Sequence, residues 1–164
     1  MRVTLPLIAA LALSGCGLHP LYGGGSGSPV AATLRSISVG PIQGQSGWLV
    51  RSKLIDRLGD PGGSAAYRLD VTLDDNITAF GLRNDRAATR ERRTLRARYQ
   101  LVDARNGMVL LDATAGSDAG IDIVSSEYAT VAAEQTALES LSDIVADQIT
   151  ARVALYASRT AKAK

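Results

Sequence analysis

Residues 93–115 read RTLRARYQLVDARNGMVLLDATA, and the topology of the whole domain can be worked out from them. Apolar residues alternate with polar ones over 93–102, as in a strand with one buried and one solvated face. The dipeptide Asn106-Gly107 favours a tight turn, because both residue types tolerate the positive φ angles of such turns. Residues 108–115 then return as the partner strand. We therefore predict an antiparallel hairpin that turns at 103–107.

Two further strands precede this hairpin. Residues 67–73 place Tyr67 and every second residue after it on one apolar face, which predicts a strand. A short alternating run at 34–42 predicts another, joined to the sheet at an edge or in the middle. We expect residues 75–90 to form a long polar connection. The segments together predict a four-stranded, mostly antiparallel sheet.

Two helices are expected beside the strands. Residues 48–58 have apolar residues at helical spacing, with Trp48 expected as a core anchor, and a glycine- and proline-rich stretch at 59–63 ends the helix. The longest helix follows the last strand, where Ser125 or Ser126 can cap its start. Its apolar stripe is formed by Val131, Leu138, Leu141, Val145, Ile149 and Tyr156. The order strand, helix, three strands, helix (β-α-β-β-β-α) predicts an α+β domain.

The beginning of the chain predicts export and lipidation. Residues 13–16 read LSGC and follow a charged start and a short apolar run, which is typical of a signal peptide at 1–15. LSGC resembles the lipobox of bacterial lipoproteins, whose cysteine is acylated and becomes the first mature residue. Cys16 would then anchor the protein to a membrane, and by resemblance Gly17 favours the outer membrane. The alternative is a cytosolic protein with a strand at 1–15 and a buried Cys16 thiol.

The rest of the chain divides into a tether, one domain and a tail. Residues 16–32 include the run GGGSGS and predict a lipidated flexible tether that spans about 20–25 Å. Residues 33–158 have the size of a single α+β domain, and residues 159–164 are predicted to be a disordered basic tail. Because the sequence has one cysteine, it cannot form an internal disulfide.

Residue types that catalysis requires are scarce. The only histidine, His19, lies in the tether, and the only cysteine is the expected lipidation site, so a Ser-His or Cys-His relay cannot form. The sequence has no glycine-rich phosphate loop, no metal-ligand cluster and no aromatic residues between cations of the kind that bind nucleic acid. Asp70, Asp74 and Asp75 are expected to be solvated. We therefore predict a protein that is not an enzyme and uses no cofactor or metal.

Charge is unevenly distributed, although the net charge is only +2. Residues 83–98 hold seven arginines against two acids, whereas residues 127–147 hold five acids and no cation. Arginine suits bidentate contact with phosphate or carboxylate, so this segment is a candidate site for a phosphorylated glycolipid or an acidic protein loop. The candidate contact residues are Arg86, Arg90, Arg92, Arg96 and Arg98. Alternatively, Arg96 and Arg98 form ion pairs with Asp70 and Asp74 on the neighbouring strand.

Several short motifs follow one another along the chain in a characteristic order. They are CGLHPLYG at 16–23, YQLVD at 99–103, SEYA at 126–129, AE at 133–134, and ADQI at 146–149 with Arg152. The first resembles the start of the mature lipopolysaccharide-assembly lipoproteins of the LptE (RlpB) family in alphaproteobacteria. The second resembles their third strand, and the others resemble their final helix.

This resemblance implies both a fold and a function. The implied fold is a four-stranded sheet with two helices packed on one face. Family members sit as a plug inside the outer-membrane β-barrel LptD, assist its assembly and help to deliver lipopolysaccharide to the outer leaflet. Arginines of segment 83–98 would then contact lipid A phosphates or acidic residues of the barrel wall. Cys16 would hold the protein on the periplasmic face of the outer membrane.

Two other functions suit a lipid-anchored α+β domain. One is an accessory lipoprotein of an envelope phospholipid or solvent transporter, which would bind a soluble or inner-membrane partner. The other is a structural envelope lipoprotein that binds peptidoglycan, although the sequence shows none of the surface chemistry expected for that role. The identity of the bound partner distinguishes these functions from barrel assembly.

Overall fold

A computed structural model describes residues 28–82 and 88–162 of the chain. Its elements are α2 (Pro29–Arg35), β1 (Ile37–Val39), α3 (Gly44–Leu58), β2 (Tyr67–Leu82), β3 (Ala88–Asp103), β4 (Val109–Asp122) and α4 (Glu127–Lys162). The predicted order strand, helix, three strands, helix is confirmed, and α2 is added before the first strand. The described part is therefore an α+β fold, as predicted.

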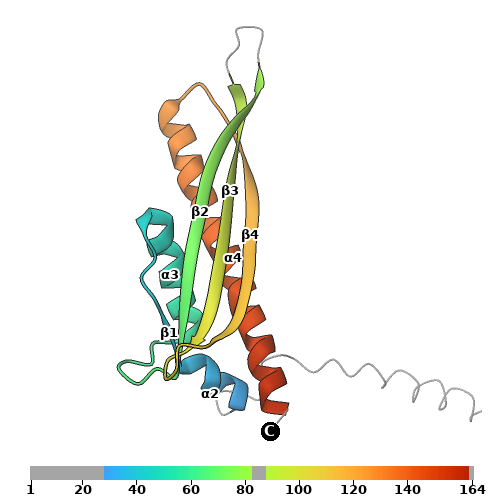
Figure 1. Cartoon of the computed structure of the whole chain (residues 1–164). Helices are drawn as coiled ribbons and strands as arrows, with labels where there is room; N and C mark the ends of the chain where they lie inside the picture. The colour runs from blue at the N-terminus through green and yellow to red at the C-terminus, as the bar shows by residue number, and fades with distance from the viewer. Residues whose placement is uncertain (1–27, 83–87, 163–164) are drawn as a thin grey trace, which may run out of the picture.

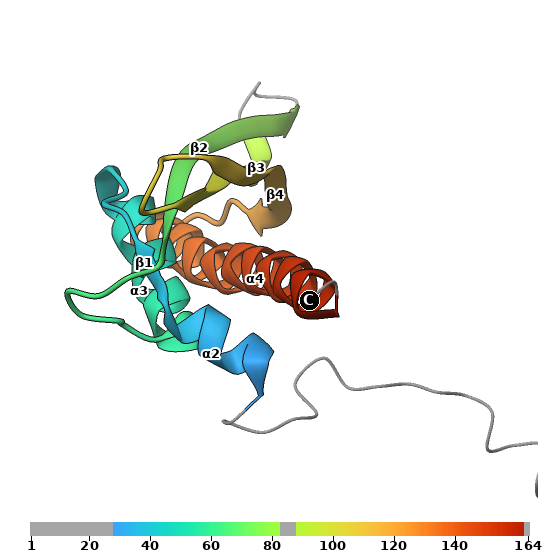
Figure 2. The same ribbon diagram turned by 60° about the horizontal axis from the view of Figure 1, so that its bottom comes forward.

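The four strands form one sheet in the order β1-β2-β3-β4. The pairs β2-β3 and β3-β4 are antiparallel, as predicted, whereas β1 runs parallel to β2, so the sheet is mixed. The first strand lies at an edge. Helices α3 and α4 lie on the same side of the sheet, and the other side carries no helix of the described chain (Figure 1, Figure 2).

The predicted turn between β3 and β4 is confirmed. Gly107 has a φ angle of +72°, a conformation that glycine adopts without strain. The backbone N–H of Gly107 donates to the Asp103 carbonyl at 2.9 Å, and the N–H of Asp103 donates to the Met108 carbonyl at 2.9 Å. The Asp103 carboxylate accepts a further bond from the backbone N–H of Arg105. Local turn chemistry therefore sets this hairpin.

The predicted polar connection at 75–90 is wrong for most of its length. Strands β2 and β3 continue to pair from Asp75 with Leu95 to Leu82 with Ala88, and residues 83–87 lie outside the described ranges. The side chains of 76–81 are exposed on both faces of the sheet. A strand that is wet on both faces lacks the alternation of apolar and polar residues by which strands are predicted. Strand β4 flanks this extension as far as the pair Arg90 and Asp122, and beyond it β2 and β3 form a short two-stranded tip (Figure 1).

The predicted strand at 34–42 is wrong at its beginning, because α2 occupies Pro29–Arg35 and β1 spans only Ile37–Val39. The Ser28 hydroxyl caps α2 by accepting a hydrogen bond from the backbone N–H of Ala31 at 3.1 Å. Pro29 stands in its first turn, where no backbone donor is required. The side chain of Leu34 is buried. Residues 29–32 of the predicted tether therefore belong to a helix.

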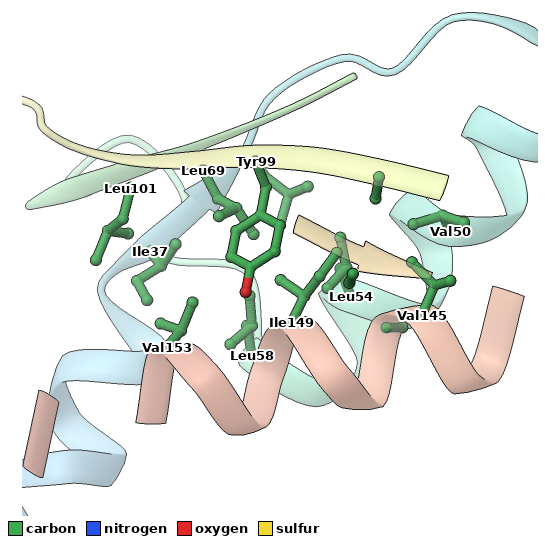
Figure 3. Close-up of a cluster of buried hydrophobic side chains, with 14 of the residues drawn as sticks. Ile37, Val50, Leu54, Leu58, Leu69, Tyr99, Leu101, Val145, Ile149 and Val153 are labelled. Carbon is green, nitrogen blue, oxygen red and sulfur yellow. The ribbon is translucent and has the colours of Figure 1, made fainter. Parts of the chain in front are cut away.

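The core lies between the sheet and its two long helices. Tyr99 extends from the middle of β3 toward α4, between aliphatic side chains of both layers (Figure 3). The largest fully buried side chains are Tyr99, Ile37, Leu54, Leu58, Leu69, Leu95, Leu101, Leu138, Leu141, Ile149, Val50 and Val145. Four of the six residues of the predicted α4 stripe are therefore core residues. Tyr156 is partly buried against the core.

Two predicted core residues are exposed. Trp48 is 67% exposed, because α3 buries the face formed by Gly47, Val50, Leu54 and Leu58. Val131 is 56% exposed near the start of α4. Helix α4 also continues to Lys162, so residues 159–162 belong to a helix and not to the predicted tail. Ser126 is the residue near the start of α4 whose hydroxyl accepts a backbone bond, from Ala129 at 3.4 Å.

Ion pairs fasten α3 to α4. Arg57 of α3 contacts Asp147 at 2.6 Å and Asp143 at 3.1 Å, and Lys53 contacts Asp143 at 3.0 Å. The pKa of Asp143 lies below its usual value because Lys53, and then Arg57, bind its charged form. Two of the five acids of segment 127–147 are thus balanced by cations of α3, and this part of the acidic helix is not a free negative surface.

We predict that Ile149→Ala lowers the free energy of unfolding by about 2–5 kcal/mol, because it leaves a cavity at a completely buried position. The matched control is Val131→Ala on the same helix, which should change stability by less than about 0.5 kcal/mol because Val131 is exposed. Urea denaturation followed by circular dichroism measures both values. Equal effects of the two substitutions would contradict the assigned packing of α4.

Candidate ligand face of the sheet

Four of the five candidate arginines share one face of the sheet. An even number of positions along β3 separates each of these arginines from the others: Arg90, Arg92, Arg96 and Arg98. Because side chains of a strand alternate between faces, and the buried Leu95, Ala97 and Tyr99 face the helices, these arginines face the opposite way. The fifth candidate, Arg86, lies outside the described residues. We call this helix-free side of β2, β3 and β4 the outer face.

Three of the four arginines form ion pairs with β4. Arg90 contacts Asp122 at 2.8 Å, Arg96 contacts Asp118 at 3.2 Å, and Arg98 contacts Asp112 at 2.9 Å. Cross-strand ion pairs were predicted for Arg96 and Arg98, but with Asp70 and Asp74 of β2, and that choice of partners is wrong. We call these three pairs the ion-pair ladder.

The ladder forms on β4 because that strand provides both room and acids. Arg96 stands opposite Gly116, where a Cβ atom would come within 2.5 Å of the Arg96 Cδ atom. The arginine can therefore cross β4 and reach both Asp118 and the Ser117 carbonyl, which it contacts at 3.0 Å. On β2, Asp70 is already held by Arg68 at 2.8 Å. A glycine thus decides the direction of the arginine side chain.

The ladder neutralises most of the positive charge that the sequence concentrates here. The outer face of the described strands carries five arginines and five aspartates: Arg68, Arg90, Arg92, Arg96, Arg98, Asp70, Asp74, Asp112, Asp118 and Asp122. Arg98 and then Gln100 lower the pKa of Asp112, and Thr94 and then Arg96 lower the pKa of Asp118, by hydrogen bonding to the carboxylates. Both acids therefore stay charged at neutral pH.

Arg92 has a different environment from the other three arginines. Its guanidinium lies over the exposed Phe80 ring, 5.4 Å from the ring centroid, and within the described ranges no carboxylate comes within ion-pair distance of it. Its neighbour across the sheet is Gly120, beside which the space is open. Stacking on a ring leaves the edge of a guanidinium available for a bidentate anion. Arg92 is thus the candidate best placed to bind one.

A hollow of about 530 Å³ lies beside the ladder. Its lining includes Arg96 and Arg98 together with the small residues Thr72, Thr114 and Gly116. A space of this size is in the range of small-molecule sites. The side chains around it could hold a phosphate or carboxylate if an arginine exchanged its aspartate for the ligand.

Arg93 belongs to the same arginine cluster in sequence but faces the helices. It donates to both carboxylate oxygens of Asp75, at 2.9 and 2.7 Å, and to the Glu134 backbone carbonyl at 3.0 Å. The Arg93 and Asp75 side chains are only 13% and 19% exposed. Arg93 therefore joins the tip of the sheet to the start of α4 and is not available to a ligand.

Glu91 also faces α4, although no sequence pattern marked it as a candidate residue. Its Oε2 atom is buried and accepts no hydrogen bond from the described part of the protein. Burial, and then the nearby Glu134 carboxylate, raise the pKa of Glu91. Because the two acids are 43 residues apart in sequence, only the packing of α4 on β3 brings them together.

Neither a metal site nor a membrane span is present in the described ranges. Residues 28–82 and 88–162 contain no group of histidine, cysteine and acidic side chains that could hold a metal ion. No helix among them is both long enough and apolar enough to cross a bilayer. The predicted lipidation site, Cys16, lies outside the described residues.

The chain shares its fold with several bacterial lipoproteins. A Caulobacter crescentus CB15 protein assigned as a lipoprotein is 28% identical, with a TM-score of 0.68 over 81% of this chain and 98% of that chain. The minor lipoprotein of Acinetobacter baumannii is 17% identical, with a TM-score of 0.55 over 73% and 90% of the two chains. Rare lipoprotein B of Shewanella oneidensis is 10% identical, with a TM-score of 0.51 over 76% and 94%. The latter two show the fold alone.

The sequence identifies the family to which the protein belongs. It matches the lipopolysaccharide-assembly family LptE over residues 34–153, which is most of the chain, and the protein therefore belongs to this family. The family is not a known enzyme family. No curated protein matches the sequence.

We predict that Glu91→Gln raises the melting temperature at pH 7 and leaves it unchanged below about pH 4. The pKa of Glu91 is higher in the folded protein than in the unfolded chain. The contribution of Glu91 to stability is therefore complete below the pKa of the unfolded chain, about 4.3, and is lost as the pH rises through the pKa of the folded protein. Glutamine has no carboxylate to ionise, so the variant does not lose this stability at neutral pH. Thermal unfolding between pH 3.5 and 8 provides the measurement.

Glu139→Gln is the matched control, since Glu139 is an exposed carboxylate on α4. Its melting curve should follow the wild type over the whole pH range. A lower melting temperature for Glu91→Gln at pH 7 would show that the Glu91 charge stabilises the fold, contrary to the geometry.

Proposed function

We propose that this protein is an outer-membrane lipoprotein that plugs the β-barrel LptD, assists assembly of that barrel and helps to deliver lipopolysaccharide to the outer leaflet. The observation that carries the proposal is the match to the lipopolysaccharide-assembly family over residues 34–153. The fold adds support, because a narrow sheet with long helices on one side leaves its charged outer face open to a surrounding wall (Figure 2).

The anchor of this lipoprotein would be Cys16. The LSGC motif at 13–16 supports acylation of its thiol after export. More than one acyl chain is needed for stable anchoring, since each buried methylene contributes about 0.8 kcal/mol. A triacylated Cys16 would hold the protein on the periplasmic face of the outer membrane.

The outer face would bind lipid A phosphates or acidic residues of the barrel wall through Arg86, Arg90, Arg92, Arg96 and Arg98. Arg92 would make the first contact, because it stacks on Phe80 and has no aspartate partner within the described ranges. Arg96 and Arg98 border the 530 Å³ hollow but are already paired with Asp118 and Asp112. They would bind an anion only by exchanging partners. Binding should therefore depend on the acids of the ladder as well as on the arginines.

We predict that the acylated protein, purified from detergent-solubilised outer membrane at high salt, retains LptD in equal amount. High salt removes weak contacts between exposed charges, so a plug enclosed by a barrel should survive the wash. Mass spectrometry identifies and quantifies the bound chain. Recovery of an inner-membrane transporter, or of no partner, would contradict the proposal and favour the accessory-transporter function.

We predict that Arg92→Ser weakens the binding of micellar lipopolysaccharide about tenfold, because a charge-assisted hydrogen bond contributes roughly 1.5–3 kcal/mol. Asp118→Asn should strengthen binding, since it releases Arg96 from its partner. Titration of the purified variants measures both effects.

Arg68→Ser serves as the control, because Arg68 lies on the same face but pairs with Asp70 at the far end of β2. It should bind like the wild type. Unchanged binding after replacement of Arg90, Arg92, Arg96 and Arg98 together by serine would rule out this face as the lipid contact, and equal weakening by Arg68→Ser would reveal a non-specific effect of charge.

A further inference from the structure

The end of the molecule opposite the two-stranded tip contains a separate groove. It lies where α2, the first residue of β2 and the end of α4 meet, and Figures 1 and 2 show α2 beside this end of α4. The groove has a volume of about 260 Å³. Its lining residues are Pro29, Thr33, Tyr67, Tyr156, Ala157, Thr160 and Ala161. We call it the basal groove.

The basal groove suits an apolar peptide segment. Tyr67 and Tyr156 provide two half-buried aromatic rings, and Pro29, Ala157 and Ala161 provide small apolar surfaces. No arginine, lysine, aspartate or glutamate is among its lining residues. Grooves lined by aromatic rings bind extended, proline-containing segments, because proline loses little conformational entropy on binding.

A segment of this composition precedes the groove in the same chain. Residues 18–22 read LHPLY, with two leucines, a proline and a tyrosine, and their apolar character does not suit a spacer. Residues 23–28 read GGGSGS and join this segment to Pro29, which itself lines the groove. Six residues of glycine-rich chain have a root-mean-square span of about 12–15 Å. The segment is thus tethered beside the groove at an effective concentration on the order of millimolar.

We propose that residues 18–22 bind in the basal groove of their own domain, with Pro20 and Tyr22 against the rings of Tyr67 and Tyr156. This docking does not rest on the proposed function. Its consequence for the membrane does, through acylation of Cys16: only Gly17 would then separate the lipidated residue from the docked segment. The base of the domain would be held against the bilayer. The domain could then not move away from the membrane by the span of about 20–25 Å that we predicted for a free tether.

Disulfide trapping tests the docking in the mature chain with Cys16→Ser, which removes the only native thiol. Gly23→Cys follows the docked segment directly, and Thr160→Cys lies on the exposed rim of the groove. We expect these two cysteines to form a disulfide within one molecule. The rate of cross-linking should fall at least about tenfold when Leu18 and Leu21 are both replaced by serine. The matched control combines Gly23→Cys with Ala32→Cys, because Ala32 is exposed on α2 and lies outside the groove lining. Replacing Leu18 and Leu21 by serine should not reduce the cross-linking rate of this control pair.

A second measurement does not need new cysteines. In the Cys16→Ser chain, the serine variant at Leu18 and Leu21 should shift the amide NMR signals of Thr33, Ala157 and Thr160, whereas Gly24→Ser in the linker should not. Because the substituted residues precede α2, the domain itself should keep its melting temperature to within a few degrees.

Three results would overturn the proposal. Equal cross-linking with and without the serine substitutions, together with unchanged amide signals, would mean that the segment is not in the groove. Cross-links only between molecules would assign the groove to a second copy. Signal changes seen only when the wild-type, acylated protein is compared with Cys16→Ser would assign it to an acyl chain. Loss of LptD binding affects none of these readouts, so this proposal and the proposed function fail independently.

Discussion

The packing of α4 along the sheet is the contact on which the rest of the structure depends. Leu141, Val145 and Ile149 are buried along one side of the helix, and each contributes about 1.5–3 kcal/mol by leaving water. The sheet could not provide this stability alone, because β1 pairs over only three residues and no helix within residues 28–82 and 88–162 covers the outer face. The contacts of Arg57 with Asp143 and Asp147 attach α3 to the same helix.

The sequence predicts the fold best where one side of an element is buried and the other is wet. The 67–73 and 93–102 strands and the core residues of α4 meet this condition, and the Asn106-Gly107 turn is predicted by its local turn chemistry. The prediction fails where the condition is absent: residues 76–81 are wet on both faces, and α2 has only seven residues. Trp48 shows a further limit, since residue type suggests burial but the helical position relative to Val50 and Leu54 decides it.

The site was predictable in its composition but not in its electrostatics. Alternation along β3 places Arg90, Arg92, Arg96 and Arg98 on one face, as a reading of the strand predicts. The register of β4, which is not encoded locally, brings aspartates beside three of them, and Gly116 turns Arg96 in that direction. The closeness of Glu91 to Glu134 likewise follows from tertiary packing. Charge counted along a sequence therefore overestimates the charge that a surface presents.

The two-stranded tip affects how this domain can change in length. Only the ends of β2 and β3 beyond the Phe80–Arg90 pair extend past β4, so insertions or deletions there need no compensation in β4 or α4, provided that each strand changes by two residues and its faces stay in phase. Beside the core, two added strand residues lengthen the sheet by about 6.6 Å, which α4 can follow only by adding about four residues. Length differences between relatives should therefore accumulate at the tip and be rare beside α4.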